Sequence, residues 1–301
     1  MKKEIEETIL LWQRDNLARN LSPDSMETYA SSARDFMQYF EERGIHKFKQ
    51  LTDNVIKDYI LKQKERSCSA RTVNNRLKAL RRVCHFYEEE IKPGYVIPNF
   101  AFQHEEMTTR MPLPDEEVFK VVKHFSPDDP HSVLVAFILD TGLRSKSVRN
   151  VRVEDLDLEC GYVTIRVTKN RDVLHLPMSA VLTDLLRQYI RENGMQGGSL
   201  FRNTDGGAMY DRSTVYKAVK RYLKKCGVNK SGVHLFRYTF GKIMIENNCN
   251  PMLLQQWFGH RTLDETKKYI KLYSNALKDV CEDVTPLAKN GKILKKMAAE
   301  C

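Results

Sequence analysis

The sequence predicts a mainly α-helical protein with a small antiparallel β-sheet, organised in two domains. Three observations lead to this fold class. Apolar side chains recur at helical spacing through the first hundred of the 301 residues. A stretch with two prolines and a glycine follows, and later come short segments rich in β-branched residues before helices return. At this length two hydrophobic cores are also a better expectation than one.

Four helices are expected in the amino-terminal domain. The first covers residues 5–20, Ser25 is expected to cap the second, and Thr52 the third. Ser69 or Thr72 begins the fourth, which carries an apolar stripe on one side. Its other side is basic and rich in amides, a face suited to DNA, and holds Arg71, Asn74, Asn75, Lys78, Arg81 and Arg82.

Composition shifts set the remaining boundaries. We predict a first domain at 1–92, a linker at 93–113, a second domain at 114–285 and a tail at 286–301. The second domain is predicted to contain helices at 115–124, 131–142, 180–193, 211–225, 235–247, 251–258 and 263–283. Its predicted strands are 151–158, 162–168 and 173–177.

The composition also argues against several classes of protein. The longest apolar run, Val133–Leu139, is far shorter than the roughly 20 residues of a membrane helix, and the first residues do not resemble a signal peptide. The seven cysteines are scattered and never form a C-x-x-C pair. This pattern favours reduced thiols in a cytoplasmic protein over a disulfide framework or a zinc site. No membrane contact is expected.

Positive charge is concentrated in two places, beyond the formal net charge of +10. Between Lys62 and Arg82 eight basic residues face one acidic residue, and between Tyr210 and Lys242 nine face one. Two solvated helix faces would explain this pattern, and so would two phosphate-binding surfaces. The candidates for DNA contact in the second cluster are Arg212, Lys217, Lys220 and Arg221.

Four short motifs in the second domain carry candidate chemistry: T-G-L-R at 141–144, T-K-N-R at 168–171, H-L-F-R at 234–237 and G-H-R-T-L-D-E-T-K-K-Y at 259–269. Each residue alone has an ordinary explanation, such as an ion pair, a hairpin tip, a helix cap or a core histidine. Tyr273 shares a helical face with Tyr269 and is its rival. The candidate catalytic residues are Arg144, Lys169, His234, Arg237, His260 and Tyr269.

Together these side chains suit phosphoryl transfer from DNA. Two arginines can neutralise the non-bridging oxygens of a phosphodiester and the added charge of its transition state. Histidines can accept the nucleophile's proton, and a lysine can protonate the departing 5′ oxygen. A tyrosine can attack phosphorus and form a covalent phosphotyrosine, which conserves the bond energy. This chemistry requires neither a metal ion nor another cofactor.

The sequence resembles the tyrosine recombinases of the phage-integrase family over nearly its whole length. The resemblance includes S-x-x-T-Y at 25–29, A-R-T-V-N-N-R-L at 70–77 and the order of the six catalytic candidates. Their nine-residue interval from G-H to tyrosine also matches, as does Pro177, which follows Lys169 by eight residues.

The resemblance implies a helical, SAM-like core-binding domain and a mixed α/β catalytic domain that close on duplex DNA as a C-shaped clamp. It implies Tyr269 as nucleophile, with the other five candidates around it, and a homo-tetramer on two synapsed core sites that exchanges strands through a Holliday junction. The tail would dock on a neighbouring protomer or fray. Transposon or phage integrases and Xer-like resolvases are the types that it resembles, and an accessory factor or second recombinase is not visible in the sequence.

Three positions depart from the family pattern: Ser147 replaces a common acidic residue, Tyr238 a histidine, and Phe258 the leucine of L-G-H. At the first of these positions, Ser147 lacks the carboxylate that would help to hold Arg144 in place. Other functions predict different sequence features. A type IB topoisomerase would have a different amino-terminal half. A metal-dependent nuclease could be built only on the acids at 154, 155, 157 and 159, which alternate with apolar residues as in a surface strand. An accessory DNA-binding protein with an inert or partner-dependent pocket is the main alternative.

Overall fold

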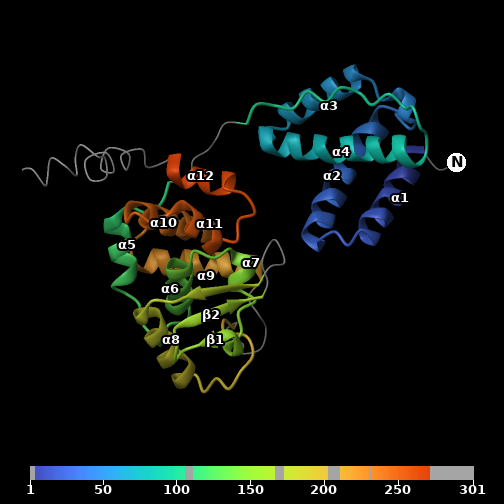
Figure 1. Ribbon diagram of the computed structural model, residues 1–301. Coiled ribbons are helices and arrows are strands. Elements are labelled where there is room, and N and C mark those ends of the chain that lie inside the picture. Colours follow the sequence, from blue (N-terminus) through green and yellow to red (C-terminus); the bar gives the residue numbers. More distant parts are fainter. Residues whose placement is uncertain (1–3, 106–110, 167–172, 203–210, 231, 272–301) are drawn as a thin grey trace, which may run out of the picture. The chain divides into compact units, whose positions relative to one another are not determined.

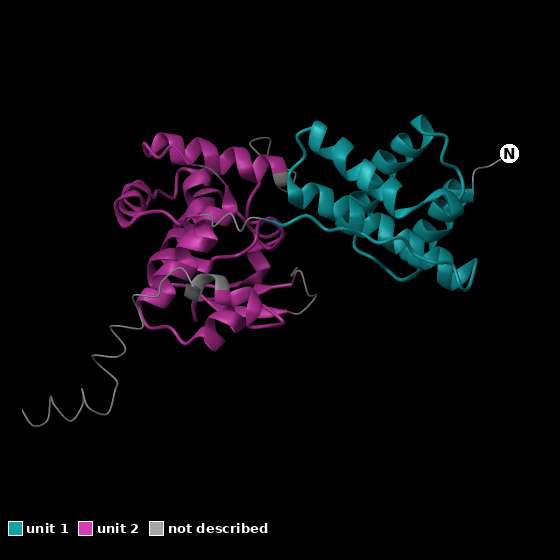
Figure 2. Ribbon diagram, turned by 90° about the horizontal axis from the view of Figure 1, so that it is seen from above, with its two compact units in different colours: residues 1–108 teal, residues 109–301 magenta. Residues whose placement is uncertain are grey.

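The computed structural model describes residues 4–105, 111–166, 173–202, 211–230 and 232–271. The chain divides into two compact units, residues 1–108 and 109–301 (Figure 2). Each unit has its own hydrophobic core. Among the described residues, helices dominate and the strands form one sheet, as the sequence predicts (Figure 1). None of the described helices is long and apolar enough to cross a membrane.

The first unit is a bundle of helices. Its elements are α1 Glu4–Ala18, α2 Pro23–Glu42, a 3₁₀ turn at Phe48–Gln50, α3 Asp53–Glu65 and α4 Ala70–Glu90. The half-buried carboxylate of Asp35 on α2 ties three helices together. It accepts hydrogen bonds from Tyr59 (2.6 Å) and Gln63 (2.9 Å) of α3 and forms an ion pair with Arg76 of α4 (3.2 Å).

The helix starts in this unit follow from side-chain caps. Thr52 accepts the N–H of Val55, so the predicted cap of α3 is confirmed. Of the two candidates for the start of α4, the cap is Ser69, which accepts the N–H of Thr72. The prediction that Ser25 caps α2 is wrong: the cap is Ser22, whose hydroxyl accepts the N–H of Ser25. Pro23 explains the earlier start, because proline suits the first turn of a helix, where its missing N–H costs nothing.

The second unit packs its helices around α6. Its helices are α5 Asp115–Val122, α6 Pro130–Thr141, α7 Ser145–Val148, α8 Ala180–Glu192, α9 Arg212–Lys225, α10 Val233–Glu246, α11 Pro251–Trp257 and α12 Asp264–Lys271. Helix α6 contacts α8, α9 and α10, and most of its residues are buried. An apolar sequence on all sides is typical of such a central helix.

The sheet is smaller than the sequence predicts. Strands β1 Leu156–Asp157, β2 Tyr162–Ile165 and β3 Leu174–Pro177 are antiparallel in the order β1-β2-β3. The prediction of one strand over 151–158 is wrong, because residues 153–155 form a 3₁₀ turn. The carboxylate of Asp155 closes this turn by accepting the N–H of Arg152 (3.0 Å). Residues 272–283 of the last predicted helix, and the tail, lie outside the described residues.

Candidate active site

A glycine turn at the end of α6 begins the site. Gly142 adopts φ +61°, and its N–H bonds to the carbonyl of Ile138 (2.9 Å). A Cβ at this position would lie 2.8 Å from the rings of Phe240 on α10 and Phe258 after α11. Only glycine suits both the left-handed backbone and this close approach. The turn sets Arg144 at the start of α7, against the segment that follows α11.

Arg237 forms the buried centre of the site. It lies in the second turn of α10 with 3% of its surface exposed. Its guanidinium donates to the carbonyl of Gly142 (2.8 Å) and stacks on the ring of Phe258, 3.7 Å from the ring centroid. Because a buried charge needs such partners, these contacts hold the planar group in one orientation.

His260 lies beside Arg237, in the loop after α11. The Nε2 atom of its ring is 2.9 Å from a guanidinium nitrogen of Arg237. Gln255 holds the loop through two hydrogen bonds: the backbone N–H of His260 donates to the Gln255 carbonyl (3.0 Å), and the side-chain amide of Gln255 donates to the His260 carbonyl (3.1 Å). At Gly259 the backbone has φ +58°, and a Cβ there would lie 3.0 Å from Leu174 at the start of β3.

A carboxylate completes the described cluster. Glu265 of α12 forms an ion pair with Arg144 (3.2 Å), and its oxygen is also 3.7 Å from Nε2 of His260. Arg144 and Arg237 both donate to the carbonyl of Phe258, each at 3.4 Å. Arg144 and His260 therefore face one negatively charged group, and Arg237 lies against the same histidine. Such an arrangement binds an anion, and a phosphodiester is one.

The other catalytic candidates are described less completely. His234 is exposed in the first turn of α10, one helical turn before Arg237. Tyr269 belongs to α12, but its side chain is outside the described part of the structure. Lys169 falls within 167–172, also outside it. The structure thus brings together Arg144, Arg237 and His260.

Sequence reasoning missed two residues of the cluster, Glu265 and Thr266. The Thr266 hydroxyl is 2.8 Å from Nδ1 of His260, and Thr266 is fully buried. Both residues lie within the nine-residue interval between His260 and Tyr269, one turn before the tyrosine on the same helix. Their position three and four residues before Tyr269, on the same predicted helix, is the feature of the sequence that could have identified them. Ser147, the departure near Arg144, is 7% exposed on α7.

Three of the four acids on which a nuclease could be built bond to the local fold instead. Asp155 closes the 3₁₀ turn and pairs with Arg166 (2.7 Å). Glu154 accepts the N–H of Gly198 (3.0 Å), and Asp157 that of Cys160 (2.8 Å). Hydrogen bonds from its own backbone N–H and that of Gly198, together with Arg152, lower the pKa of Glu154 to about 2. These carboxylates therefore have protein partners that a metal ion would have to replace.

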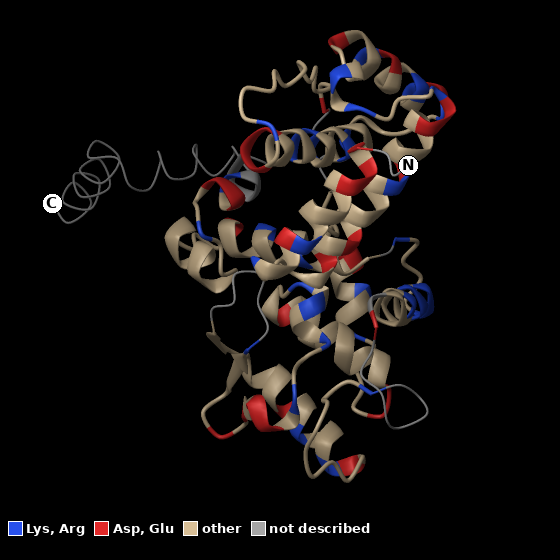
Figure 3. Ribbon diagram, turned by 90° about the vertical axis from the view of Figure 1, so that its right-hand side faces the viewer, with Lys and Arg blue, Asp and Glu red and all other residues tan. Residues whose placement is uncertain are grey.

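The predicted basic face of α4 is exposed at five of its six positions, namely Arg71, Asn75, Lys78, Arg81 and Arg82, and Figure 3 colours the basic ones blue. Asn74 differs, because it is buried and its amide binds the segment after α4. It donates to the carbonyl of Gln103 (2.8 Å) and accepts the N–H of the same residue (2.7 Å). Its side chain therefore has an internal role, which the sequence pattern did not indicate.

Glu105 continues this segment. Its carboxylate accepts hydrogen bonds from Asn74 (2.9 Å) and Arg71 (3.1 Å), and these bonds lower its pKa. In the second unit, Lys217, Lys220 and Arg221 of α9 are exposed, and the side chain of Arg212 is outside the described part. Both predicted basic clusters thus present charge at the surface of a helix.

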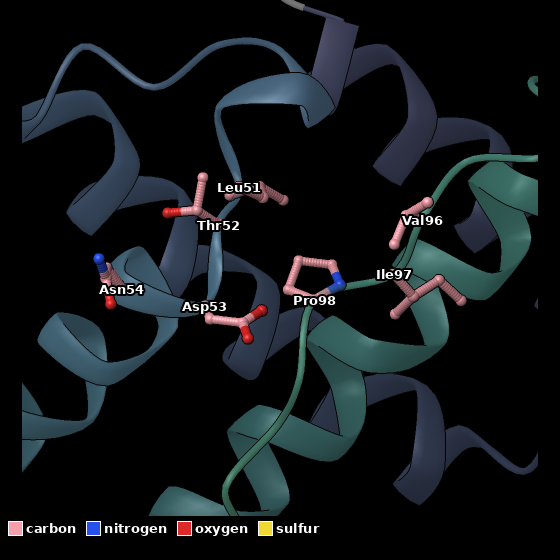
Figure 4. Close-up of a pocket in the computed structure, with 7 residues that line it drawn as sticks. All are labelled: Leu51, Thr52, Asp53, Asn54, Val96, Ile97 and Pro98. Atoms are coloured by element: carbon pink, nitrogen blue, oxygen red, sulfur yellow. The ribbon is translucent and has the colours of Figure 1, made fainter.

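A surface hollow of about 370 Å³ lies in the first unit, whereas the residues that carry the predicted chemistry belong to the second. Figure 4 shows its lining, which runs from Leu51 to Asn54 and from Val96 to Pro98. Its one titratable side chain, Asp53, accepts the N–H of Asn99 (2.9 Å). The hollow offers neither a cationic group nor a nucleophile, so we assign it no part in the site.

Comparison with known proteins agrees with this architecture. The tyrosine recombinase XerC of Halalkalibacterium halodurans is 25% identical over 292 residues, which cover 90% of this chain and 94% of that protein. XerA of Pyrococcus furiosus is 27% identical over 173 residues, 56% of this chain and 60% of that protein.

Solved structures share the fold. The XerH site-specific recombinase bound to palindromic difH substrate superposes with a TM-score of 0.72 at 20% identity, over 88% of this chain and 81% of that one. The Tn1549 transposon integrase in complex with transposon right end DNA gives 0.71 at 17% identity, over 92% and 99%.

Two family models match separate parts of the sequence. The model of the phage integrase N-terminal SAM-like domain matches residues 12–90, and that of the phage integrase family matches residues 113–276. The second match alone covers more than half of the chain and includes all six catalytic candidates. The chain therefore belongs to the phage integrase family, that of the tyrosine recombinases.

Proposed function

We propose that the chain cleaves and rejoins duplex DNA at specific sites through a 3′-phosphotyrosyl intermediate. The observation that carries the proposal is a cluster in which Arg144 and His260 both face the carboxylate of Glu265, while Arg237 contacts the same histidine. The scissile phosphate would replace that carboxylate. Each arginine would then donate to non-bridging oxygens, whose charge grows in the transition state.

The nucleophile in this proposal is Tyr269. Its phenolic oxygen attacks phosphorus, a new O–P bond forms, and the bond from phosphorus to the 5′ oxygen breaks. The tyrosine's proton passes to a histidine, His234 or His260, and Lys169 protonates the departing 5′ oxygen. The reverse reaction uses the free 5′ hydroxyl of another strand, so that rejoining needs no ATP and the steps need no metal ion.

The β2–β3 hairpin supports the role given to Lys169. Ile165 pairs with Leu174 as the last pair of the ladder before the connecting residues. Leu174 packs against Gly259, the neighbour of His260. The described end of the hairpin at Leu174 therefore lies against the loop of His260, and in the sequence Lys169 belongs to the residues that join Ile165 to Leu174.

Larger assemblies follow from the same proposal. The exposed basic residues of α4 and α9 would bind the DNA backbone, with affinity that falls as salt rises. Two chains would bind each core site, and a homo-tetramer would hold two sites and pass through a Holliday junction. The biological outcome would be integration or excision of a mobile element, or resolution of DNA multimers. The reaction would take place in the cytoplasm, and the scheme allows an accessory factor to take part.

The test is covalent capture on DNA. A duplex is first selected from a random-sequence library with the Tyr269→Phe protein. A nicked version of that duplex, which loses a short strand after cleavage and so cannot be resealed, is then incubated with protein in EDTA. We expect a protein–DNA adduct on denaturing gels with the wild type and with Tyr273→Phe, and none with Tyr269→Phe.

Two results would contradict the proposal. An adduct that persists in Tyr269→Phe but disappears in Tyr273→Phe would assign the nucleophile to the rival tyrosine. Specific binding with no adduct for any variant would favour the accessory protein with an inert or partner-dependent pocket.

A further inference from the structure

Thr266 differs from other buried helical threonines of this chain. Thr8, Thr183 and Thr239 each donate their hydroxyl to the carbonyl four residues earlier, all at 2.9 Å. For Thr266 that carbonyl would belong to residue 262, which precedes the first residue of α12. Its hydroxyl instead lies 2.8 Å from Nδ1 of His260, with both side chains buried.

The surroundings of His260 decide which ring nitrogen carries the proton. A guanidinium has only donors, so the contact from Arg237 at 2.9 Å requires a lone pair on Nε2. The proton of the neutral ring is therefore on Nδ1, where it faces the hydroxyl oxygen of Thr266. A threonine hydroxyl can accept this hydrogen bond, because its oxygen has two lone pairs.

We propose that Thr266 is a positioning residue for the reaction: its hydroxyl accepts the Nδ1–H of His260 and keeps Nε2 as the acceptor that faces Arg237 and the anion position. This inference rests on the proposed function. Thr266 acts only through His260. It also lies on α12 three residues before Tyr269, so the same hydrogen bond fixes the histidine ring relative to the helix that carries the nucleophile.

Two substitutions separate the hydroxyl from the packing. Thr266→Val keeps the shape of the side chain and removes the acceptor, whereas Thr266→Ser keeps the acceptor. Thr183→Val is the matched control, because it removes another buried hydroxyl from the same unit, on α8. The adduct-formation rate is measured on the nicked, library-selected duplex, and the affinity of each protein for the intact duplex is measured alongside.

We expect Thr266→Val to slow adduct formation about tenfold, which corresponds to the upper end of the net contribution of one hydrogen bond. Thr266→Ser and Thr183→Val should stay within about threefold of the wild type, and duplex affinity should be unchanged in all three proteins. A second readout needs no activity: ¹⁵N spectra of histidine-labelled wild type, with His260 assigned by its loss in His260→Gln, should show the Nδ1–H tautomer.

The inference is overturned if Thr266→Val reacts like the wild type, if Thr266→Ser is as slow as Thr266→Val, or if His260 carries its proton on Nε2. Failure of the proposed function is a separate result, because Tyr269→Phe would then still form the adduct or no protein would form it. In that case the tautomer measurement alone still decides whether Thr266 sets the proton on His260.

Discussion

Replacing Glu265 by glutamine should make the protein bind its DNA more tightly. The carboxylate of Glu265 is 3.2 Å from Arg144 and 3.7 Å from His260, in the place proposed for the scissile phosphate. A phosphate that enters must break this ion pair, and the free energy of the pair is subtracted from the binding. Glutamine has the same shape but no charge, so the competition weakens.

The structure sets the size of the effect. The two side chains are 24% and 38% exposed, which makes the pair a partly solvated one. Such pairs contribute up to about 1 kcal/mol. Since 1.4 kcal/mol corresponds to tenfold in affinity, the dissociation constant should fall by up to about fivefold.

Fluorescence anisotropy with the library-selected duplex measures the change, in a Tyr269→Phe background that prevents cleavage. Asp264→Asn is the matched control, because it removes one carboxylate from the same helix, where Asp264 pairs with Lys267 (2.6 Å) rather than with Arg144. If Glu265→Gln binds no more tightly than Asp264→Asn, general charge explains the gain and the competition argument is refuted. Weaker binding by Glu265→Gln would refute it as well.

Three further predictions concern stability and reactivity. Gly142→Ala should lower the free energy of unfolding by about 2–4 kcal/mol in urea titrations, since it adds left-handed strain to a 2.8 Å clash with two aromatic rings; a smaller loss than 1 kcal/mol would contradict this. For Asp129, burial raises the pKa, but the Lys225 ammonium and two backbone N–H groups lower it overall, so its stabilising effect is complete above pH 4 and lost as the pH falls further. The stability gap between wild type and Asp129→Asn should therefore shrink below pH 4, and a constant gap would count against the ion pair. Burial raises the pKa of the Cys84 thiol to about 12, so iodoacetamide at pH 8 should leave Cys84 unmodified and alkylate the exposed Cys160, as peptide mass spectrometry would show; equal labelling would disprove the burial argument.

Local signals predicted the helices well and the sheet less well. Thr52 and Ser69 have the right side chain at the right distance before an apolar stripe, and each caps its helix. For α2 both Ser22 and Ser25 are possible N-caps, and Pro23 favours Ser22 because proline suits the first position of a helix. The alternating pattern at 151–158 suited a strand, but the bond from Asp155 to the N–H of Arg152 made a turn instead.

The contacts within the site depend on the tertiary fold. The motifs named Arg144, Arg237 and His260, but only packing of α6 against α10 sets the Gly142 carbonyl beside Arg237. The position of Asn74 also depends on the tertiary fold, because this residue of the predicted exposed face is buried and hydrogen-bonded to Gln103. Its partner Gln103 lies 29 residues away, beyond any helical periodicity.

The hydrogen bonds of Asn74 bear on where the chain can be cut into fragments. Two of them join Gln103 to α4, and the N–H of Leu113 donates to the hydroxyl of Thr239 on α10 (2.9 Å). A fragment that stops after Glu105 keeps the bonds between Asn74 and Gln103, and one that starts at Met111 keeps the bond between Leu113 and Thr239. Loose ends are where proteases usually begin, so fragments cut at these points should resist trimming better than fragments cut at 92 or 114.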